Sequence, residues 1–295
     1  MIFGLFKDFG AMNAGPVFAA FEQGVQKLGH TAVGGHMDMP DVAVIWSVLW
    51  NGKMSKNKEV MDHFIKQGKK VIVLEVGGLI RNQTWKVGIG GINGEAYFGH
   101  ETENTSDRLR SMKIKIQPWR LKSYQPRYIL ICGQNEKSHQ WRDMPPMQNW
   151  VTKTISEIRQ YTDRDIRIRP HPRSPLDMNW TQQTINDFND VYFNQPRHIA
   201  GSYDDYDFEK QLSDAWCVIN WSSNPATQAV LNGIPVFTGP ESLAAPVANL
   251  RLARIEDPDM PDRQQWANNV AYTEWTIEEI AQGLPLARLI DKLKS

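Results

Sequence analysis

Residues 216–237 constrain the fold of this 295-residue chain most, because they predict a strand, a tight turn, a short helix and a second strand in direct succession. The apolar run 217–220 suits a strand buried on both faces. The hydroxyl and amide groups of residues 222–224 favour a helix start, and Pro225 fits the first helical turn. Gly233 can then end the helix in a left-handed conformation. The stretch predicts a strand–helix–strand unit of an α/β fold.

The turn inside this stretch has the properties of an anion site. A helix start presents unpaired N–H groups and the positive end of the helix dipole, here at residues 223–226. The hydroxyl groups of Ser222 and Ser223 stand beside them in the sequence. The combination predicts a phosphate site, and an ordinary, well-capped α/β turn is the alternative.

The N-terminal part of the chain alternates strand-like and helix-like segments. Apolar runs predict strands, and apolar side chains at helical spacing predict helices. We expect strands at residues 1–6, 31–33, 41–49 and 69–75 and helices at residues 17–28 and 56–67. Such nearly continuous apolar strands are typical of a parallel sheet covered on both faces, so an open doubly wound domain is predicted.

Polar residues at the ends of these strands are the first candidates for a site, because the carboxyl ends of strands line the ligand crevice of open α/β sheets. Glu75 ends a predicted strand, and Arg81 follows it across two glycines. Asp8, Gly10 and Asn13 follow the first strand in a glycine-containing loop. We assign all five to the same cleft, with an ordinary loop carboxylate as the alternative for Glu75.

A glycine-rich loop and a basic strip separate the two halves of the chain. Residues 87–94 are too rich in glycine for a regular element and predict a mobile loop beside the cleft. The basic strip has no acidic residue and consists of Arg108, Arg110, Lys113, Lys115, Trp119, Arg120, Lys122, Tyr124 and Arg127. It can contact phosphates and stacked bases, or it can be a solvated connector. We therefore expect an N-terminal domain at 1–112, a basic linker at 113–127 and a C-terminal domain with terminal helices at 128–295.

The alternation of strands and helices restarts after the linker, which indicates a second domain. A strand is expected at residues 128–132, and Gly133 and Gln134 form a glycine turn at its end. An amphipathic helix is expected at 147–161, followed by a second strand at 165–172. Gly133 and Gln134 are therefore candidates for the ligand crevice of this domain.

Prolines on both sides restrict the backbone of His171 at the end of that second strand. Arg169 and Arg173 are close to it in the sequence. A phosphate oxygen can accept a hydrogen bond from an imidazole held in this way. The motif predicts a phosphate contact, and a structural histidine is the alternative.

Two further polar segments follow. The acidic residues in 203–208 are compatible with a metal site, but we assign them to the start of a helix at 208–214, where acidic side chains are favoured. Glu241 and Ser242 lie in a glycine-containing turn after the strand that ends the 216–237 stretch. We place them in the same cleft and expect no bound metal.

The cysteines, the net charge and the distribution of apolar residues predict where the protein is found and which classes of partner it does not have. Cys132 and Cys217 lie in apolar runs, which predicts buried free thiols in a reducing compartment. The 33 basic residues balance 33 acidic ones, which argues against a polycation that coats nucleic acid. Because no run of about 18 apolar residues occurs, we expect a cytoplasmic protein without membrane insertion.

The Arg-Pro-His-Pro motif at 169–172 and the run 222–236 resemble the donor-binding half of GT-B glycosyltransferases, in particular capsule-polysaccharide and Kdo-transferase-like enzymes. In that group these motifs hold the phosphate and nucleotide of an activated sugar. Residues 75–81 are similar to an acidic, glycine-containing segment of the other domain, where a carboxylate attends the reacting sugar. The resemblance implies an α/β fold with two Rossmann-like doubly wound domains that face a cleft.

The resemblance also implies which residues bind the donor. They are Arg169, His171, Arg173, Ser222, Ser223, Asn224, Thr227 and Gln228, to which Gly133 and Gln134 are added by their position. Many such enzymes carry a glutamate that binds the donor ribose where this chain has Gln228.

We therefore expect a metal-independent glycosyltransferase that needs no cofactor besides its nucleotide-sugar co-substrate. His171 would stabilise the leaving phosphate, and Glu75, with Asp8 in reserve, would act as base or nucleophile. The acceptor is expected to be a glycan, or a hydroxymethylated pyrimidine in DNA, such as phage DNA, contacted by the basic strip. The alternatives are a nucleotide-sugar epimerase or hydrolase, and a non-catalytic nucleotide- or DNA-binding module.

Overall fold

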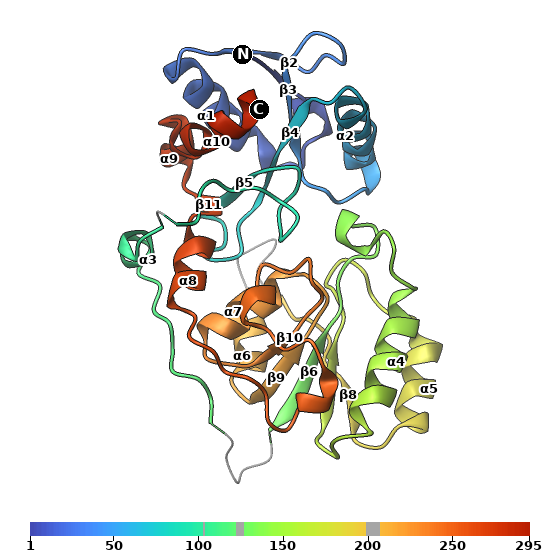
Figure 1. Ribbon diagram of the computed structural model, residues 1–295. Helices are drawn as coiled ribbons and strands as arrows, with labels where there is room; N and C mark the ends of the chain where they lie inside the picture. Colours follow the sequence, from blue (N-terminus) through green and yellow to red (C-terminus); the bar gives the residue numbers. More distant parts are fainter. Residues whose placement is uncertain (103, 122–126, 199–206) are drawn as a thin grey trace. The chain divides into compact units, whose positions relative to one another are not determined.

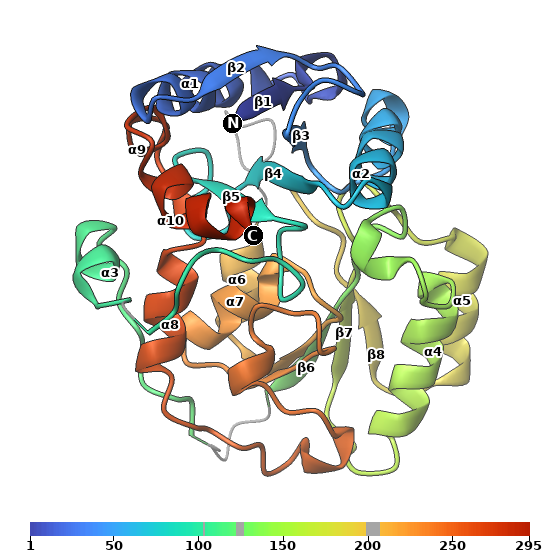
Figure 2. The same ribbon diagram turned by 45° about the horizontal axis from the view of Figure 1, so that its top comes forward.

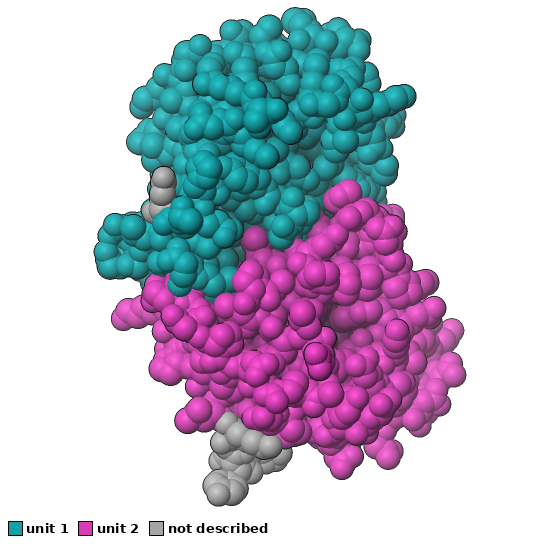
Figure 3. All heavy atoms as spheres, viewed as in Figure 1, with its two compact units in different colours: residues 1–114, 265–295 teal, residues 115–264 magenta. Residues whose placement is uncertain are grey.

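A computed structural model divides the chain into two compact units (Figure 3). It describes all residues except 103, 122–126 and 199–206. Unit 1 contains residues 1–114 and 265–295, and unit 2 contains residues 115–264. None of the described helices is both long and apolar enough to cross a membrane.

Unit 1 is built on a six-stranded sheet in the order β11-β5-β4-β3-β1-β2. Strands β1 to β4 run parallel, whereas β5 is antiparallel to β4 and β11 is antiparallel to β5. Its elements are β1 (Ile2–Leu5), η1 (Lys7–Phe9), α1 (Ala14–Lys27), β2 (Thr31–Gly34), β3 (Val42–Trp46), η2 (Gly52–Ser55), α2 (Lys56–Lys66), β4 (Lys70–Val76), β5 (Trp85–Ile89), α3 (Asp107–Ser111), α8 (Gln264–Ala271), β11 (Glu274–Trp275), α9 (Ile277–Ala281) and α10 (Leu284–Lys294).

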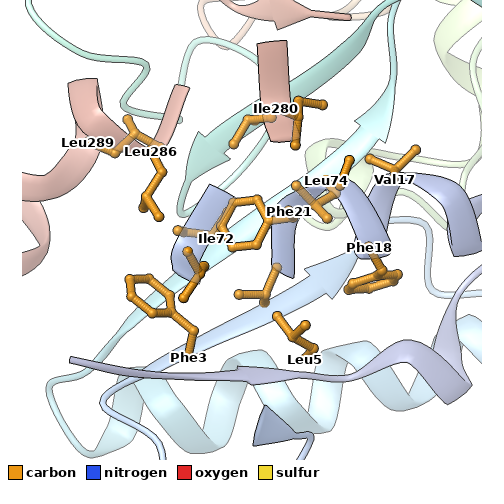
Figure 4. Close-up of a cluster of buried hydrophobic side chains, with 14 of the residues drawn as sticks. Phe3, Leu5, Val17, Phe18, Phe21, Ile72, Leu74, Ile280, Leu286 and Leu289 are labelled. Carbon is orange, nitrogen blue, oxygen red and sulfur yellow. The ribbon is translucent and has the colours of Figure 1, made fainter. Parts of the chain in front are cut away.

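Helices cover both faces of this sheet, as the apolar strands predict. Helices α1, α9 and α10 lie on one face and α2 on the other (Figures 1 and 2). Figure 4 shows the larger core, in which Phe3 of β1 and Phe21 of α1 meet Ile280 of α9 and Leu286 of α10. On the other face Phe64 of α2 packs in a second core with side chains of β3 and β4. The doubly wound fold predicted for this part is confirmed.

The C-terminal helices belong to unit 1, whereas the predicted boundary put them in the second domain. Apolar side chains of β11, α9 and α10 complete the larger core of unit 1. The buried Arg108 anchors the same segment, because its guanidinium bonds Glu279 at 2.7 Å and stacks 3.8 Å from the centre of the Trp275 ring. The basic strip therefore begins with a structural arginine of unit 1.

Residues 87–89 belong to strand β5, so the loop predicted at 87–94 is wrong for its first three residues. The glycine that suggested a loop has a packing reason. A Cβ atom at Gly88 would lie 2.7 Å from the ring of Phe98. Glycine is needed there for close packing of an aromatic ring on a strand.

Unit 2 contains a five-stranded, fully parallel sheet in the order β10-β9-β6-β7-β8. Its helices and strands are β6 (Tyr128–Cys132), η3 (His139–Trp141), α4 (Met147–Ile158), β7 (Ile166–Arg169), α5 (Met178–Asp187), β8 (Val191–Phe193), α6 (Phe208–Leu212), β9 (Ala215–Ile219), α7 (Asn224–Leu231), β10 (Val236–Phe237), η4 (Ala245–Val247) and η5 (Leu252–Arg254). Helices α4 and α5 lie on one side of the sheet and α6 and α7 on the other (Figures 1 and 2). The predicted second doubly wound domain is confirmed.

The strands of unit 2 bury both predicted cysteines. Cys132 in β6 and Cys217 in β9 are free thiols. Burial raises the pKa of the Cys132 thiol to about 12, so it stays protonated at neutral pH. Both residues are therefore apolar core groups of the sheet.

Residues 216–237 fold as strand β9, helix α7 and strand β10, as predicted. Gly233 ends α7 with a left-handed φ of 73°. A Cβ atom at this position would also collide with the carbonyl oxygen of Pro118. The linker runs along this turn, since the N–H of Gln117 donates to the oxygen of Leu231 at 2.9 Å. Glycine is thus required both by conformation and by the approach of the linker.

We predict that Gly24→Ala destabilises the protein by about 1–3 kcal/mol, although alanine normally favours a helix. The reason is that a Cβ atom at Gly24 in α1 would collide with the carbonyl oxygen of Ile280 in α9. Apart from its chain neighbours, Gly15 in the same helix has no atom within 4 Å of its Cβ position, so Gly15→Ala is the control; because Gly15 precedes Pro16, this change should alter the free energy of unfolding by less than about 1 kcal/mol. Urea unfolding measures both, and equal effects would contradict the tight contact of α1 with α9.

Candidate functional site

The carboxyl ends of three parallel strands in unit 2 bring the predicted donor-binding segments to one edge of the sheet. Strands β6, β7 and β9 are adjacent and parallel, so the residues that follow them lie at the same edge. The connection after β6 leads towards β7, and the one after β9 leads towards β10 on the opposite side. This topological switch point between β6 and β9 is where open α/β sheets bind ligands.

A buried hydrogen bond joins the two loops across the switch point. The side-chain oxygen Oε1 of Gln134 accepts both the backbone N–H and the hydroxyl of Ser222, each at 3.1 Å. Gln134 and Ser222 are only 5% and 2% exposed. A buried amide oxygen with two donors holds its loop firmly, because breaking the contact would leave polar groups unsatisfied. Gln134 and Ser222 thus set the geometry of the turn.

Ser223 lies at the N-cap position of α7 but makes no side-chain cap there. The Nδ2 group of Asn220 instead donates to the carbonyl oxygen of Ser223 at 2.8 Å and to its hydroxyl oxygen at 3.0 Å. The predicted hydroxyl cap is therefore replaced by a contact with the preceding strand end. The helix start still presents its positive dipole end beside a serine hydroxyl.

Asn220 is a residue that the sequence argument missed. It is 1% exposed and follows β9 directly. Its amide fixes Ser223 in the way that Gln134 fixes Ser222. An amide placed between an apolar strand and a pair of serines is the signal that could have identified it.

His171 follows β7 and lies beside the glycine turn that follows β6. A Cβ atom at Gly133 would be 3.5 Å from the backbone nitrogen of His171, and the N–H of Gly133 donates to the oxygen of Arg169 at 2.9 Å. The Nδ1 atom of His171 accepts the backbone N–H of Arg173 at 3.1 Å. The neutral ring therefore carries its proton on Nε2, which can donate to a phosphate oxygen.

Arg169 points into the unit and pairs with an acid. Its Nη1 atom lies 2.9 Å from Oδ1 of Asp207, and the side chain is 5% exposed. Burial raises the pKa of Asp207, but the N–H of Arg197 and the guanidinium of Arg169 outweigh this and hold the pKa below its usual range. The ion pair with Asp207 therefore gives Arg169 a structural role, and its charge is not exposed to a ligand.

The remaining predicted donor-binding residues are distributed around this edge. Arg173 is exposed, and Asn224 and Gln228 are half-buried in α7. Thr227 is buried in the same helix. These residues lie on the segments that follow β7 and β9.

The turn after β10 is tied to the loop after β6. The carboxylate of Glu241 lies 2.9 Å from Nη2 of Arg142, and the ring N–H of Trp221 donates to the oxygen of Gln140 at 3.0 Å. Ser242 is buried, and its hydroxyl accepts the N–H of Ala244 at 3.1 Å. Glu241 and Ser242 therefore stabilise the loops, and Ser242 acts within its own turn.

In unit 1, Glu75 lies near the end of β4, half-buried, as the sequence predicts. The loop after it is built around the buried carboxylate of Glu274 in β11, which explains the glycine at position 77. Glu274 accepts the N–H groups of Gly78 at 2.7 Å and Leu79 at 3.0 Å, and a Cβ atom at Gly77 would collide with it. The role of Glu274 could not be predicted from the sequence, since nothing local indicates that a residue so far along the chain enters this loop.

The other candidates of unit 1 surround the end of β1. Asp8 is exposed in η1, Gly10 is buried and Asn13 is exposed at the start of α1. Strand β3 lies between β1 and β4 in the sheet and is followed by Ser47, whose φ is 65°. A buried residue other than glycine in this conformation is strained, and such strain often marks functional positions. Arg81 is exposed in the turn after β4.

Much of the basic strip is occupied by contacts within the protein. Arg120 and Arg127 donate to backbone oxygens near the start of β9, at Leu212 and Ser213. Trp119 donates to the oxygen of Pro261 at 2.8 Å and stacks under Arg263. Lys122 and Tyr124 lie outside the described residues, as does most of the acidic 203–208 segment.

Two solved structures have the same fold as this chain. The Thermosulfurimonas dismutans KpsC β-Kdo 2,7 transferase is 14% identical with a TM-score of 0.53, covering 97% of this chain and 99% of that one. The β-Kdo 2,4 transferase of KpsC from the same organism is 12% identical with a TM-score of 0.55, covering 94% and 92%. No protein-family model and no curated protein sequence matches. The predicted resemblance to Kdo-transferase-like enzymes and the GT-B-like, two-unit α/β fold are therefore confirmed.

Proposed function

We propose that this chain is a glycosyltransferase that binds the phosphate of a nucleotide sugar at the β6–β7–β9 edge of unit 2. The observation that carries the proposal is the position of three groups at one sheet edge: the His171 ring, the Ser222–Ser223 turn and the start of α7. The buried amides of Gln134 and Asn220 hold that turn. The GT-B-like fold of two Kdo transferases supports the assignment.

The chemistry follows from the charge that develops during transfer. When the bond between the anomeric carbon and the phosphate oxygen breaks, its electron pair remains on the phosphate. The Nε2–H of His171, the hydroxyl of Ser223 and the positive end of α7 can stabilise this charge without a metal ion. The acceptor oxygen then forms the new bond to the anomeric carbon and loses its proton.

We assign the reacting carboxylate to unit 1. Glu75 is the first candidate for this role, and Asp8 is the second. Glu75 is half-buried at the carboxyl end of a sheet strand, whereas Asp8 is exposed in a short helix. A carboxylate can act as a base towards the acceptor hydroxyl or as a nucleophile towards the sugar. Glu75 is the better placed, because its neighbours restrict its side chain.

A glycan hydroxyl is the acceptor that we propose. The DNA acceptor loses support, because Arg108, Trp119, Arg120 and Arg127 of the basic strip all make contacts within the protein. A nucleotide-sugar epimerase or hydrolase on the same fold remains the alternative. Turnover of a nucleotide sugar in the absence of any acceptor would favour that alternative.

We predict that at least one sugar linked to UDP, CMP, GDP or CDP raises the melting temperature of the protein. A ligand that binds only the native state at about 100 times its Kd stabilises it by about 2.7 kcal/mol. Thermal-shift measurements across the four nucleotide classes test this directly. If none of them shifts the transition even at millimolar concentration, the protein does not bind a nucleotide-sugar donor.

His171→Ala and Ser223→Ala should each lower turnover of that donor about 10²–10³-fold without unfolding the protein. Each change removes a hydrogen-bond donor to the leaving phosphate from a loop rather than from the core. Ser213→Ala is the matched control, since Ser213 is exposed and its hydroxyl donates only to the nearby oxygen of Lys210. Wild-type turnover in both test variants would exclude this edge as the phosphate site.

Glu75→Gln should abolish transfer and preserve donor binding, because it keeps the size of the side chain and removes its charge. Loss of a general base typically costs about 10²–10⁴-fold in rate. Glu59→Gln on the exposed side of α2 is the control and should leave transfer unchanged. Transfer within about threefold of wild type would move the role to Asp8 or another group.

A further inference from the structure

Lys86 in strand β5 is a buried cation that the proposed reaction does not use. Its side chain is only 1% exposed. Lysine is almost never fully buried unless a charge or hydrogen bonds compensate it. Burial lowers the pKa of Lys86, and the carboxylates of Glu274, Glu75 and Glu95 oppose that decrease. The surroundings of Lys86 are thus unusually acidic for a buried site.

The sheet places Lys86 directly between two of these acids. Strand β5 lies between β4 and β11, and Lys86 is the register partner of Glu75 on one side and of Glu274 on the other. Side chains that are directly opposite in antiparallel strands project from the same face, with Cβ atoms about 4.5–5.5 Å apart. The three residues form a row of acid, base and acid across the sheet.

The two acids of this row have different environments. Glu274 is 2% exposed, and besides two backbone N–H groups it accepts the hydroxyl of Thr84 at 2.7 Å. The hydrogen bonds of Glu274 therefore hold the loop after β4. Glu75 is half-buried, and its Oε1 atom accepts the N–H of the adjacent Val76 at 2.8 Å. Glu75 is the acid of the row that retains access to the surface of unit 1.

The ammonium of Lys86 is fixed from the other side by the loop that follows β5. Its Nζ atom lies 3.2 Å from the carbonyl oxygen of Ile92 and 3.4 Å from Oδ1 of Asn93. Glu95 closes this loop by accepting the N–H of Ile92 at 3.1 Å. These two oxygens hold the ammonium, while Glu75 lies in register with Lys86 on the neighbouring strand.

We propose that Lys86 is a positioning residue for Glu75, whose carboxylate its buried ammonium holds in one orientation at the end of β4. The inference rests on the proposed function in so far as Glu75 is the reacting group there. The pairing of Glu75 with Lys86 across the two strands is independent of any reaction, so their interaction can be tested without a substrate.

The test is a double-mutant cycle of Lys86→Met and Glu75→Gln, measured by urea unfolding. Removing one partner of a buried pair leaves the other uncompensated, so Lys86→Met alone should raise the unfolding equilibrium constant about a hundredfold or more. In the Glu75→Gln background, the factor by which Lys86→Met raises the unfolding equilibrium constant should be at least ten times smaller. The control cycle pairs Lys86→Met with Asp62→Asn, an exposed acid on α2, and should show additive effects. Additive effects in the first cycle as well would overturn the proposal.

A second measurement applies if Lys86→Met does not fold. Glu75→Gln removes a charge that raises the pKa of Lys86, so this pKa should fall further. When the pKa of a lysine is lower in the folded state than in the unfolded state, the free energy of unfolding increases with pH between these two pKa values. The stability of Glu75→Gln should therefore begin to rise with pH at a lower pH than that of wild type. Asp62→Asn should not shift this onset, and an unchanged onset in Glu75→Gln would overturn the proposal.

Kinetics separate this inference from the proposed function. With a nucleotide sugar that the protein turns over, Lys86→Met should lower kcat at least tenfold, leave KM for the donor unchanged and add no further loss to Glu75→Gln. If no nucleotide sugar is turned over, the proposed function fails while the unfolding cycle still reports the contact. Coupling in the unfolding cycle with an unchanged kcat in Lys86→Met would show that the lysine is structural only, and would overturn its positioning role.

Discussion

The hydrogen bonds from Ser222 to the side chain of Gln134 are the contact on which the unit 2 site depends. They join the loops after β6 and β9, which leave the sheet in opposite directions, and the bond from Trp221 to Gln140 joins the same two loops further out. Asn220 holds Ser223 by the opposite polarity, since its amide donates to the carbonyl and hydroxyl oxygens of Ser223. Because both amides are buried, the Ser223 hydroxyl and the start of α7 are held in place before a ligand arrives. Preorganised donors of this kind are what stabilisation of a leaving phosphate requires.

Unit 1 is completed by a segment from the other end of the chain. Arg108, Trp275 and Glu279 fasten this segment, and Glu274 enters the loop after β4. The same strand that completes the sheet therefore also supplies one acid of the charged row that contains Lys86 and Glu75. Stability of the unit and the placement of its candidate carboxylate are consequently linked, so variants near Glu274 should be assessed for folding before they are assessed for activity.

Local signals in the sequence predicted the parts of the fold that depend on local physics. Apolar runs located the parallel strands, and Pro225 and Gly233 bounded α7 correctly. The resemblance of the motif around His171 and of the serine turn indicated the GT-B-like fold. Contacts between distant residues could not be read in this way: Glu274 bonds Gly78 across 196 positions, and Arg169 pairs with Asp207. Strand β5 was missed because its glycine serves a tertiary contact with Phe98.

Amide chemical shifts recorded during titration with the stabilising nucleotide sugar can locate its phosphate. If the phosphate binds at the β6–β7–β9 edge, the largest changes should occur at Gly133, His171, Ser222, Ser223 and Asn224, and His171→Ala should reduce them. Saturable changes that leave these five amides unaffected would contradict binding at this edge.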